Sequence, residues 1–282
     1  MPRAVRALVV GLAALALLVA GMVGLAALVR GSDVAPPGPE EERCVATAND
    51  ASVVLDLEQA HYASIIAGMS VRRGLAPRAA TIALATVYQE TGIRNLDYGD
   101  RDSVGLFQQR PSQGWGTEEQ LMDPHYATRK FYDALVRVPG WETGDITEVA
   151  QRVQRSGYPD AYRDHEADAR VLASTLTGHS RGGLTCLDRS ETAGQPDELR
   201  AALRDTFGRV PTSADAAVLT LRAEDRDTAW AWAHFAVANA GRYGVAAVRV
   251  GDRQWQGSAD ELASWTRAAE GLRANRVQVT LR

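Results

Sequence analysis

An uninterrupted apolar run near the N-terminus constrains this chain more than any other feature of its sequence. Residues 7–29, ALVVGLAALALLVAGMVGLAALV, include no charged side chain. As an α-helix with a rise of 1.5 Å per residue they would reach about 34 Å, enough to cross a hydrocarbon core of about 30 Å. Arg3 and Arg6 precede the run, which predicts that residues 1–6 stay in the cytoplasm and that the rest is exported.

A cleaved signal peptide is the alternative interpretation of this run. The apolar part of a signal peptide usually covers about 7 to 15 residues and ends in a small-x-small cleavage site. Here the run is longer, and Arg30 follows it directly. We therefore predict an uncleaved single-pass anchor at residues 7–29 in the lipid bilayer of the cell membrane, with the domains outside the cell.

The exported part carries more acidic than basic side chains. Of the 31 lysines and arginines, Arg3, Arg6 and Arg30 precede residue 31, which leaves 28 against all 35 aspartates and glutamates. The difference, −7 with histidine neutral, argues against nucleic acid as a partner and sets no limit on neutral sugars. Lys130 is the only lysine, which indicates the codon bias of a GC-rich genome such as that of an actinobacterium.

The two cysteines, Cys44 and Cys186, both lie on the exported side, where disulfides persist. A bond between them would close a long loop and stabilise the fold by on the order of 5 kcal/mol in the chain-entropy model. Two unpaired buried thiols are the alternative. We predict the disulfide, which would enclose most of the helical sequence.

Composition divides the exported part into two linkers and two domains. Residues 30–43 form a proline-rich, acidic linker, and residues 187–196 form a second, polar one. Between them, residues 44–186 are predicted to form a mainly α domain. Residues 197–282 are predicted to form a small α/β accessory domain. The sequence contains no internal repeats.

The helical prediction for residues 44–186 depends on apolar side chains that recur with helical period. Gly74, Pro77 and Pro139-Gly140 supply helix start and stop signals. No stretch of this region alternates as a strand does. We expect helices at 53–73, from Pro77 to Gly92, from Asp123-Pro124 to Val138, around Ile146–Val153, and over about 160–176.

After Cys186 the pattern changes to one typical of a mixed domain. Branched residues and turn signals predict strands at 216–223 and 245–256, and a last strand at 276–282. The segment TAWAWAHFAVANAG between them predicts a helix. Four tryptophans of this region are expected in its core: Trp230, Trp232, Trp255 and Trp265.

The candidate chemistry lies in QETGIRNLDYGDRDSVGLFQQRP, residues 89–111. Glu90 falls in the last turn of a helix, where unpaired carbonyls leave a partial negative charge. That charge and the apolar residues before Glu90 raise the pKa of its carboxyl and favour the protonated acid. A protonated carboxyl in an apolar cleft can donate its proton to a glycosidic oxygen. The alternative interpretation is an ordinary helix-end glutamate in water.

This stretch resembles the catalytic motif of the lytic transglycosylases and goose-type lysozymes. In soluble-type transglycosylases the acid glutamate precedes a variable loop, then Gly-Leu-Met-Gln and, three residues on, proline; here Gly105-Leu106-Phe107-Gln108 and Pro111 follow Glu90. Gly99-Asp100-Arg101 resembles the Gly-Asp-Arg of goose-type lysozymes. LMDPHYATRKFYDAL resembles the Asp-Pro segment and helix of the same family. The likeness covers roughly residues 53–175.

The resemblance implies a lysozyme-like, mainly α fold and an enzyme that cleaves the β-1,4 glycosidic bond of peptidoglycan glycan strands. Glu90 would serve as general acid and then as base. Asp100 would be a second carboxylate, because an inverting hydrolase needs a base about 6.5–9.5 Å away to activate water. Asp97 and Asp102 compete for that role. All three could instead be loop aspartates that accept hydrogen bonds from backbone amides.

The resemblance also suggests substrate-binding residues. Ser103 and Gln108 would form the floor of the cleft. The family's Ala-Tyr-Asn-Ala-Gly segment is absent, and VQRSGYPDAY, residues 153–162, stands in its place. Gln154, Tyr158 or Tyr162 would take over its role. Thr91 and Phe107 replace the usual serine and methionine, both mild changes.

Neither a cofactor nor a metal site is predicted, because the five histidines lack the spacing of metal ligands, and no glycine-rich phosphate loop occurs. The alternative to an enzyme is a non-catalytic protein that binds peptidoglycan or holds a partner in wall synthesis. Either function places the domains on the cell-wall side of the membrane. The sequence does not identify a protein partner for the C-terminal domain.

Overall fold

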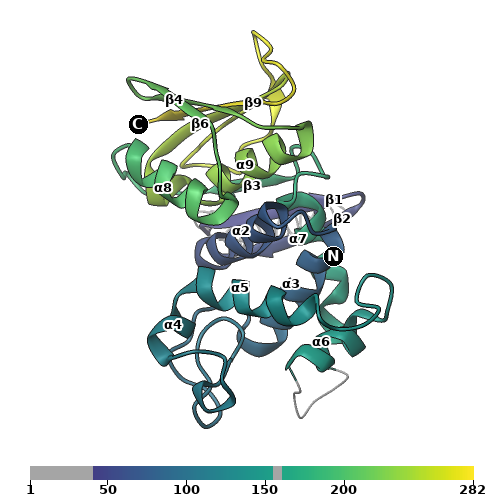
Figure 1. Cartoon of the computed structure of the whole chain (residues 1–282). Helices are drawn as coiled ribbons and strands as arrows, with labels where there is room; N and C mark the ends of the chain where they lie inside the picture. The colour runs from purple at the N-terminus through teal and green to yellow at the C-terminus, as the bar shows by residue number, and fades with distance from the viewer. Residues whose placement is uncertain (1–40, 155–160) are drawn as a thin grey trace, which may run out of the picture. The chain divides into compact units, whose positions relative to one another are not determined.

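The computed structural model describes residues 41–154 and 161–282 (Figure 1). The strands of these residues are β1 (Arg43–Ala48), β2 (Ala51–Leu55), β3 (Leu184–Leu187), β4 (Thr212–Asp215), β5 (Val218–Arg222), β6 (Val245–Val250), β7 (Arg253–Gln256), β8 (Thr266–Arg267) and β9 (Arg276–Leu281). Their helices are α2 (Leu57–Arg72), α3 (Pro77–Thr91), α4 (Glu118–Met122), α5 (Pro124–Leu135), α6 (Ile146–Gln154), α7 (Glu166–Leu176), α8 (Pro196–Phe207), α9 (Arg226–Ala238) and α10 (Ala240–Tyr243), with the 3-10 turns η1 (Pro111–Gln113) and η2 (Ala161–His165).

A three-stranded antiparallel sheet of order β2-β1-β3 brings together the two ends of the region predicted as helical, residues 44–186. Strands β1 and β2 form a hairpin in which Ala48 pairs with Ala51, and Asn49 in its turn has a φ of 52°. Asparagine tolerates this left-handed conformation better than most residues. Cys44 faces Cys186 across β1 and β3, and a disulfide joins them. The predicted disulfide is confirmed.

Helices α2 and α3 form as their local signals predict. Asp56 caps α2 through a capping box with Gln59, so the helix begins at Leu57 and the residues predicted as its first turn belong to β2. Pro77 occupies the first turn of α3. Gly92 ends α3 in the left-handed conformation, with a φ of 63°.

The remaining helices of this region surround α3. Helix α3 contacts α7, η2, α6 and α5. The helices predicted around Asp123–Val138 and Ile146–Val153 are present as α5 and α6, and the one predicted at 160–176 is divided into η2 and α7. Apolar side chains of these helices are buried in the same hydrophobic core as the inner face of α3.

The C-terminal region is a six-stranded antiparallel sheet of order β4-β5-β9-β6-β7-β8. Helix α9 packs against β6 and β9 of this sheet and also against α2, α7 and β3 (Figure 1). The strands predicted at 216–223 and 276–282 are confirmed as β5 and β9, and the helix predicted after 216–223 is confirmed as α9. The segment predicted at 245–256 is divided into the two strands β6 and β7. Trp230, Trp232 and Trp255 are buried, as predicted, and Trp265 is partly buried against the same core.

The predicted fold class is wrong. The sequence predicts a mainly α domain followed by a small α/β domain, with an N-terminal transmembrane helix. The described residues instead form two sheets, one of which lies within the region predicted as helical. Strands β1, β2 and β3 were missed because the helix predicted at 53–73 included part of β2, and because β1 and β3 are short runs that give little pattern to count.

Two further findings bear on this correction. Residues Glu41–Arg282 form one compact unit, because α9 shares a core with the helices before it. No described helix combines the length and apolar character that crossing a bilayer requires. The anchor predicted at residues 7–29 lies outside the described residues.

Candidate active site around Glu90

Glu90 lies in the last turn of α3, partly buried, where two side chains from distant parts of the sequence reach it. The Tyr162 hydroxyl donates a hydrogen bond to Glu90 Oε1 at 2.8 Å. The Gln154 amide donates to the same oxygen at 3.3 Å. No described residue donates to Glu90 Oε2. Among the described residues, the carboxyl is thus held through one oxygen.

Burial dominates the electrostatics of this carboxyl. Desolvation raises the pKa of Glu90 above its ordinary value, because the charged form loses water in a partly apolar site. The hydrogen bonds from Tyr162 and Gln154 oppose this shift and lower the pKa, because they favour the charged carboxylate. Since desolvation is the larger effect, a larger fraction of Glu90 carries its proton at a given pH than of a glutamate in water.

The loop after α3 is tied back to the same helix end. Thr91 donates a hydrogen bond from its hydroxyl to the carbonyl of Leu106 at 3.0 Å. Gln154 donates to the carbonyl of Phe107 at 2.7 Å with the same amide nitrogen that reaches Glu90. Gln154 therefore bridges the carboxyl of α3 and the backbone of the Gly-Leu-Phe-Gln turn.

The turn itself requires glycine at position 105. Gly105 has a φ of 78°, and its N–H donates to the carbonyl of Leu96 at 2.7 Å. A Cβ at this position would lie 2.3 Å from the carbonyl oxygen of Leu121. Both the left-handed backbone and the close approach exclude a side chain. The glycine of the motif thus has a structural reason that is independent of any catalytic role.

The three candidate second carboxylates occupy different positions in this loop. Asp102 accepts hydrogen bonds from Arg110 Nε and from the Ser112 backbone N–H, each at 2.7 Å, and these bonds depress the pKa of its carboxyl. Asp100 has a side chain that is 92% exposed and lies 3.9 Å from the Arg101 guanidinium. Asp97 is exposed. The interpretation as a loop-stabilising aspartate therefore describes Asp102 best.

Ser103 and Gln108 are part of the loop but make no described contact with Glu90. Ser103 is buried, and its N–H donates to the carbonyl of Asp100 at 3.1 Å. Gln108, with a φ of 47°, donates from its amide to the carbonyls of Tyr98 and Gly105. In the described structure both residues shape the loop that faces the helix end. Their predicted contacts with substrate stay a prediction.

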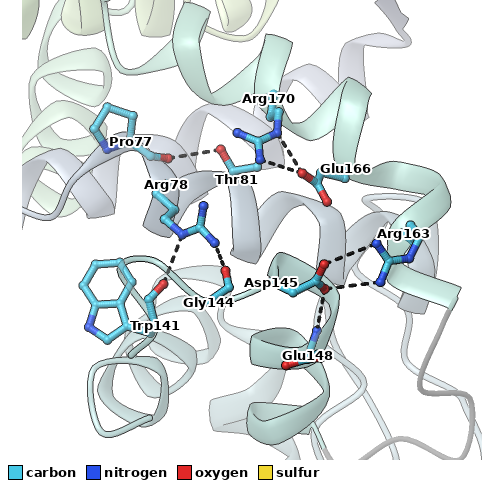
Figure 2. A network of polar contacts seen from close by, with 10 residues as sticks. All are labelled: Pro77, Arg78, Thr81, Trp141, Gly144, Asp145, Glu148, Arg163, Glu166 and Arg170. Atoms are coloured by element: carbon cyan, nitrogen blue, oxygen red, sulfur yellow. Dashed lines mark hydrogen bonds and ion pairs between the residues drawn. The ribbon is translucent and has the colours of Figure 1, made fainter. Parts of the chain in front are cut away.

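Ion pairs and capping bonds brace the elements that carry the partners of Glu90 (Figure 2). Asp145 caps the start of α6 by accepting from the Glu148 N–H at 3.1 Å. The same carboxylate binds Arg163, the residue after Tyr162 in η2, at 3.2 Å. Arg78, in the first turn of α3, donates to the carbonyls of Trp141 and Gly144 before α6. These contacts hold α3, α6 and η2 in one arrangement.

A surface cavity of about 660 Å³ is lined by Gln154, the partner of Glu90, although Glu90 itself is not part of its lining. Trp115, from the loop after η1, and Val153 contribute apolar walls. Arg137 and Arg152 contribute two exposed guanidiniums, and neither forms an ion pair with a described residue. Tryptophan faces and arginine side chains are common in sites that hold sugars bearing polar or anionic groups.

The structure thus brings together part of the predicted site. Glu90 contacts Gln154 and Tyr162, two of the three alternatives predicted in place of the Ala-Tyr-Asn-Ala-Gly segment. Tyr158 lies outside the described residues. Trp115 and the two cavity arginines were missed, although a tryptophan close after the motif was a visible signal. Within the described ranges, no group of three or more histidine, cysteine, aspartate and glutamate side chains could hold a metal ion.

Comparison with known proteins adds no family to this description. No protein-family model matches the chain, and no curated protein matches it.

Proposed function

We propose that this protein cleaves a glycosidic bond with Glu90 as the proton donor. The observation that carries the proposal is the state of that carboxyl: its pKa is raised by desolvation while both of its described hydrogen bonds go to Oε1. A glycosidase needs a carboxyl whose pKa is raised and whose orientation is fixed, so that it can act as the proton donor. The proton on Oε2 would pass to the oxygen of the leaving sugar.

The surroundings of Glu90 support the roles of its neighbours. Tyr162 and Gln154 would orient the carboxyl and then stabilise the carboxylate once the proton has left, because both donate to Oε1. Sugar residues on one side of the scissile bond would lie in the cavity that Gln154 shares with Trp115. The ring of Trp115 offers an apolar face on which a sugar can pack.

The substrate class follows from the resemblance of Glu90–Pro111 to lytic transglycosylases and goose-type lysozymes. We propose that the glycan strands of peptidoglycan are the substrate, and that the protein works outside the cytoplasm. The Cys44–Cys186 disulfide supports an oxidising compartment. The net negative charge of the chain gives no reason to expect nucleic acid.

The position of the aspartates favours a transglycosylase over an inverting hydrolase. Asp102 is committed to Arg110 and Ser112, and Asp100 is almost fully exposed. A water-activating base gains from a fixed position near the sugar, which neither carboxylate has. In a transglycosylase a hydroxyl of the substrate itself attacks, and no second carboxylate is required.

Product analysis tests the proposal. Purified protein is incubated with sacculi, and the released fragments are identified by mass spectrometry. We expect fragments that end in 1,6-anhydro-muramic acid, and Asp100→Asn should release them at a rate within a fewfold of the wild type. Reducing ends together with a large loss in Asp100→Asn would indicate an inverting hydrolase.

A non-catalytic function would give a different result in the same experiment. If the protein sediments with sacculi and releases no fragment under several pH and salt conditions, it is a peptidoglycan-binding protein and the proposed activity is wrong. Failure to sediment and to cleave would exclude both functions for this substrate.

A further inference from the structure

A second cavity is lined by three arginines and by no residue of the Glu90 loop. It has a volume of about 650 Å³ and lies at the end of α2, the end of α8, the end of β5 and the start of α9. Arg72, Arg209 and Arg222 line it. Arg209 and Arg222 are brought together by the β4–β5 hairpin that they flank, in which Thr212 pairs with Leu221. Arg72 is distant from both in the sequence, so its approach to them is a result of the tertiary structure.

The charges of this cavity are poorly balanced by the protein itself. Neither Arg209 nor Arg222 forms an ion pair or a side-chain hydrogen bond with a described residue. Arg72 donates only to the backbone carbonyl of Asp205, at 2.9 Å. Glu224 is the one acidic residue that lines the cavity, and it is exposed. The lining therefore carries three positive charges and one negative charge.

The remaining walls would suit the organic part of a ligand. Phe207 and Pro211 supply apolar surface on one side, and Trp232 contributes its indole. The Trp232 Nε1–H is buried and has no hydrogen-bond partner among the described residues. A buried donor without an acceptor destabilises the folded state, and this cost falls if a ligand or bound water supplies one.

We propose that this cavity binds a phosphate monoester. Guanidinium groups donate pairs of parallel hydrogen bonds that match the oxygens of phosphate. A phosphate monoester carries a charge of about −1.5 to −2 at neutral pH, which balances the excess of two positive charges; a single carboxylate balances only half of it. The volume of the cavity leaves room for an organic group beside the phosphate. The proposal does not depend on the proposed glycosidase activity.

Almost all cations of this chain are arginines, so several arginines can lie close together without forming a ligand site. A control pair of arginines outside the cavity separates the two cases. Arg267 and Arg273 are exposed, form no described ion pair and do not line this cavity. Arg267→Gln/Arg273→Gln therefore removes the same charge as Arg209→Gln/Arg222→Gln without touching the proposed site.

Titration calorimetry of the full chain tests the proposal, with inorganic phosphate, glucose 6-phosphate, a phosphodiester polymer and succinate as probes at constant ionic strength. We expect glucose 6-phosphate to bind more tightly than inorganic phosphate, and both more tightly than succinate or the polymer. Arg209→Gln/Arg222→Gln should weaken binding by about tenfold or more, because two charge-assisted contacts are lost. The control pair and Glu90→Gln should leave it unchanged.

Other outcomes would contradict the proposal. It is wrong if neither phosphate probe binds at millimolar concentration, or if both arginine pairs weaken binding equally, which would indicate a general charge effect. Equal binding of succinate would overturn the assignment to phosphate. Arg209→Lys/Arg222→Lys keeps the charge and should restore part of the affinity. Circular dichroism of each variant checks that a loss of binding is not a loss of fold.

Discussion

Glu90 and His234 are both ionisable side chains on helices, and burial favours the neutral form of each: it raises the pKa of Glu90 and lowers that of His234. Their surroundings differ. His234, in α9, is fully buried, and its Nδ1 contacts the Thr175 carbonyl at 2.7 Å. Burial lowers the pKa of His234 to about 4. The rings of Trp230 and Trp265 lie beside its imidazole. The His234 side chain is 0% exposed, so a substrate at the surface does not reach it in this structure.

Around Glu90 the same physical effect has another consequence. Both hydrogen bonds that described residues donate to its carboxyl go to one oxygen, and its partner Gln154 lines an open cavity. The difference teaches that desolvation by itself does not define an active site. A shifted pKa becomes a candidate for catalysis when the group also has a free atom next to a space that a ligand can enter.

The largest effect is expected from Glu90→Gln on cleavage of sacculi. The amide keeps the shape of the side chain and removes the transferable proton, so the rate should fall by roughly 10²- to 10⁴-fold. Glu142→Gln, at an exposed glutamate in the loop before α6, should cleave at the wild-type rate. Rates of fragment release measured for all three proteins make the comparison. Full activity of Glu90→Gln would show that Glu90, like His234, is a buried ionisable residue without a catalytic role.

Because His234 is buried, we expect the protein to lose stability in acid. The folded-state pKa of about 4 lies below the ordinary 6.5, so the folded state binds fewer protons than the unfolded state between these values. Its stability is therefore complete above pH 6.5 and is lost as the pH falls towards 4, by up to about 3 kcal/mol. Urea unfolding across this range measures the loss. His234→Gln should reduce the loss without abolishing it, because burial also lowers the pKa of His61 to about 4, and His179→Gln, at an exposed histidine, should leave the profile unchanged.

A smaller effect is expected from Tyr162→Phe. Loss of the hydroxyl removes one hydrogen bond from Glu90 Oε1, which should raise the pKa of Glu90 further and slow cleavage by about tenfold. The pH at which the rate falls on the alkaline side should move upward. Tyr98→Phe, at an exposed tyrosine, is the control. An unchanged pH profile would show that Tyr162 does not set the state of Glu90.

The smallest effect concerns stability at Glu90 and has the opposite pH dependence to that at His234. Because the folded-state pKa of Glu90 is raised, the folded state binds more protons, and stability falls as the pH rises from the unfolded to the folded pKa. Glu90→Gln should therefore be more stable than the wild type at pH 7, by on the order of 1 kcal/mol. The gain should vanish near pH 4. Thermal unfolding at both pH values tests it, and a gain that persists in acid would point to another cause.

Some of this molecule could be read from local sequence. Pro77 and Gly92 mark the start and end of α3, and the helical period of 3.6 puts Glu90 in its last turn. Asn49 and Asp50, between two short apolar runs, mark the β1–β2 turn, whereas the helix predicted at 53–73 wrongly includes part of β2. These features depend on residues within one or two turns of each other.

The pairing of Cys44 with Cys186 also follows from sequence, because only two cysteines exist. The partners of Glu90 do not. Gln154 and Tyr162 lie 64 and 72 residues after Glu90, and their contact depends on how α6 and η2 pack against α3. Arg72 lines the same cavity as Arg209 and Arg222 for the same reason, whereas the β4–β5 hairpin already joins the last two. Helix capping and periodicity depend on residues that are near each other in the sequence, so the sequence determines them. Packing decides which distant side chains share a cavity, because it depends on how whole helices and strands fit together.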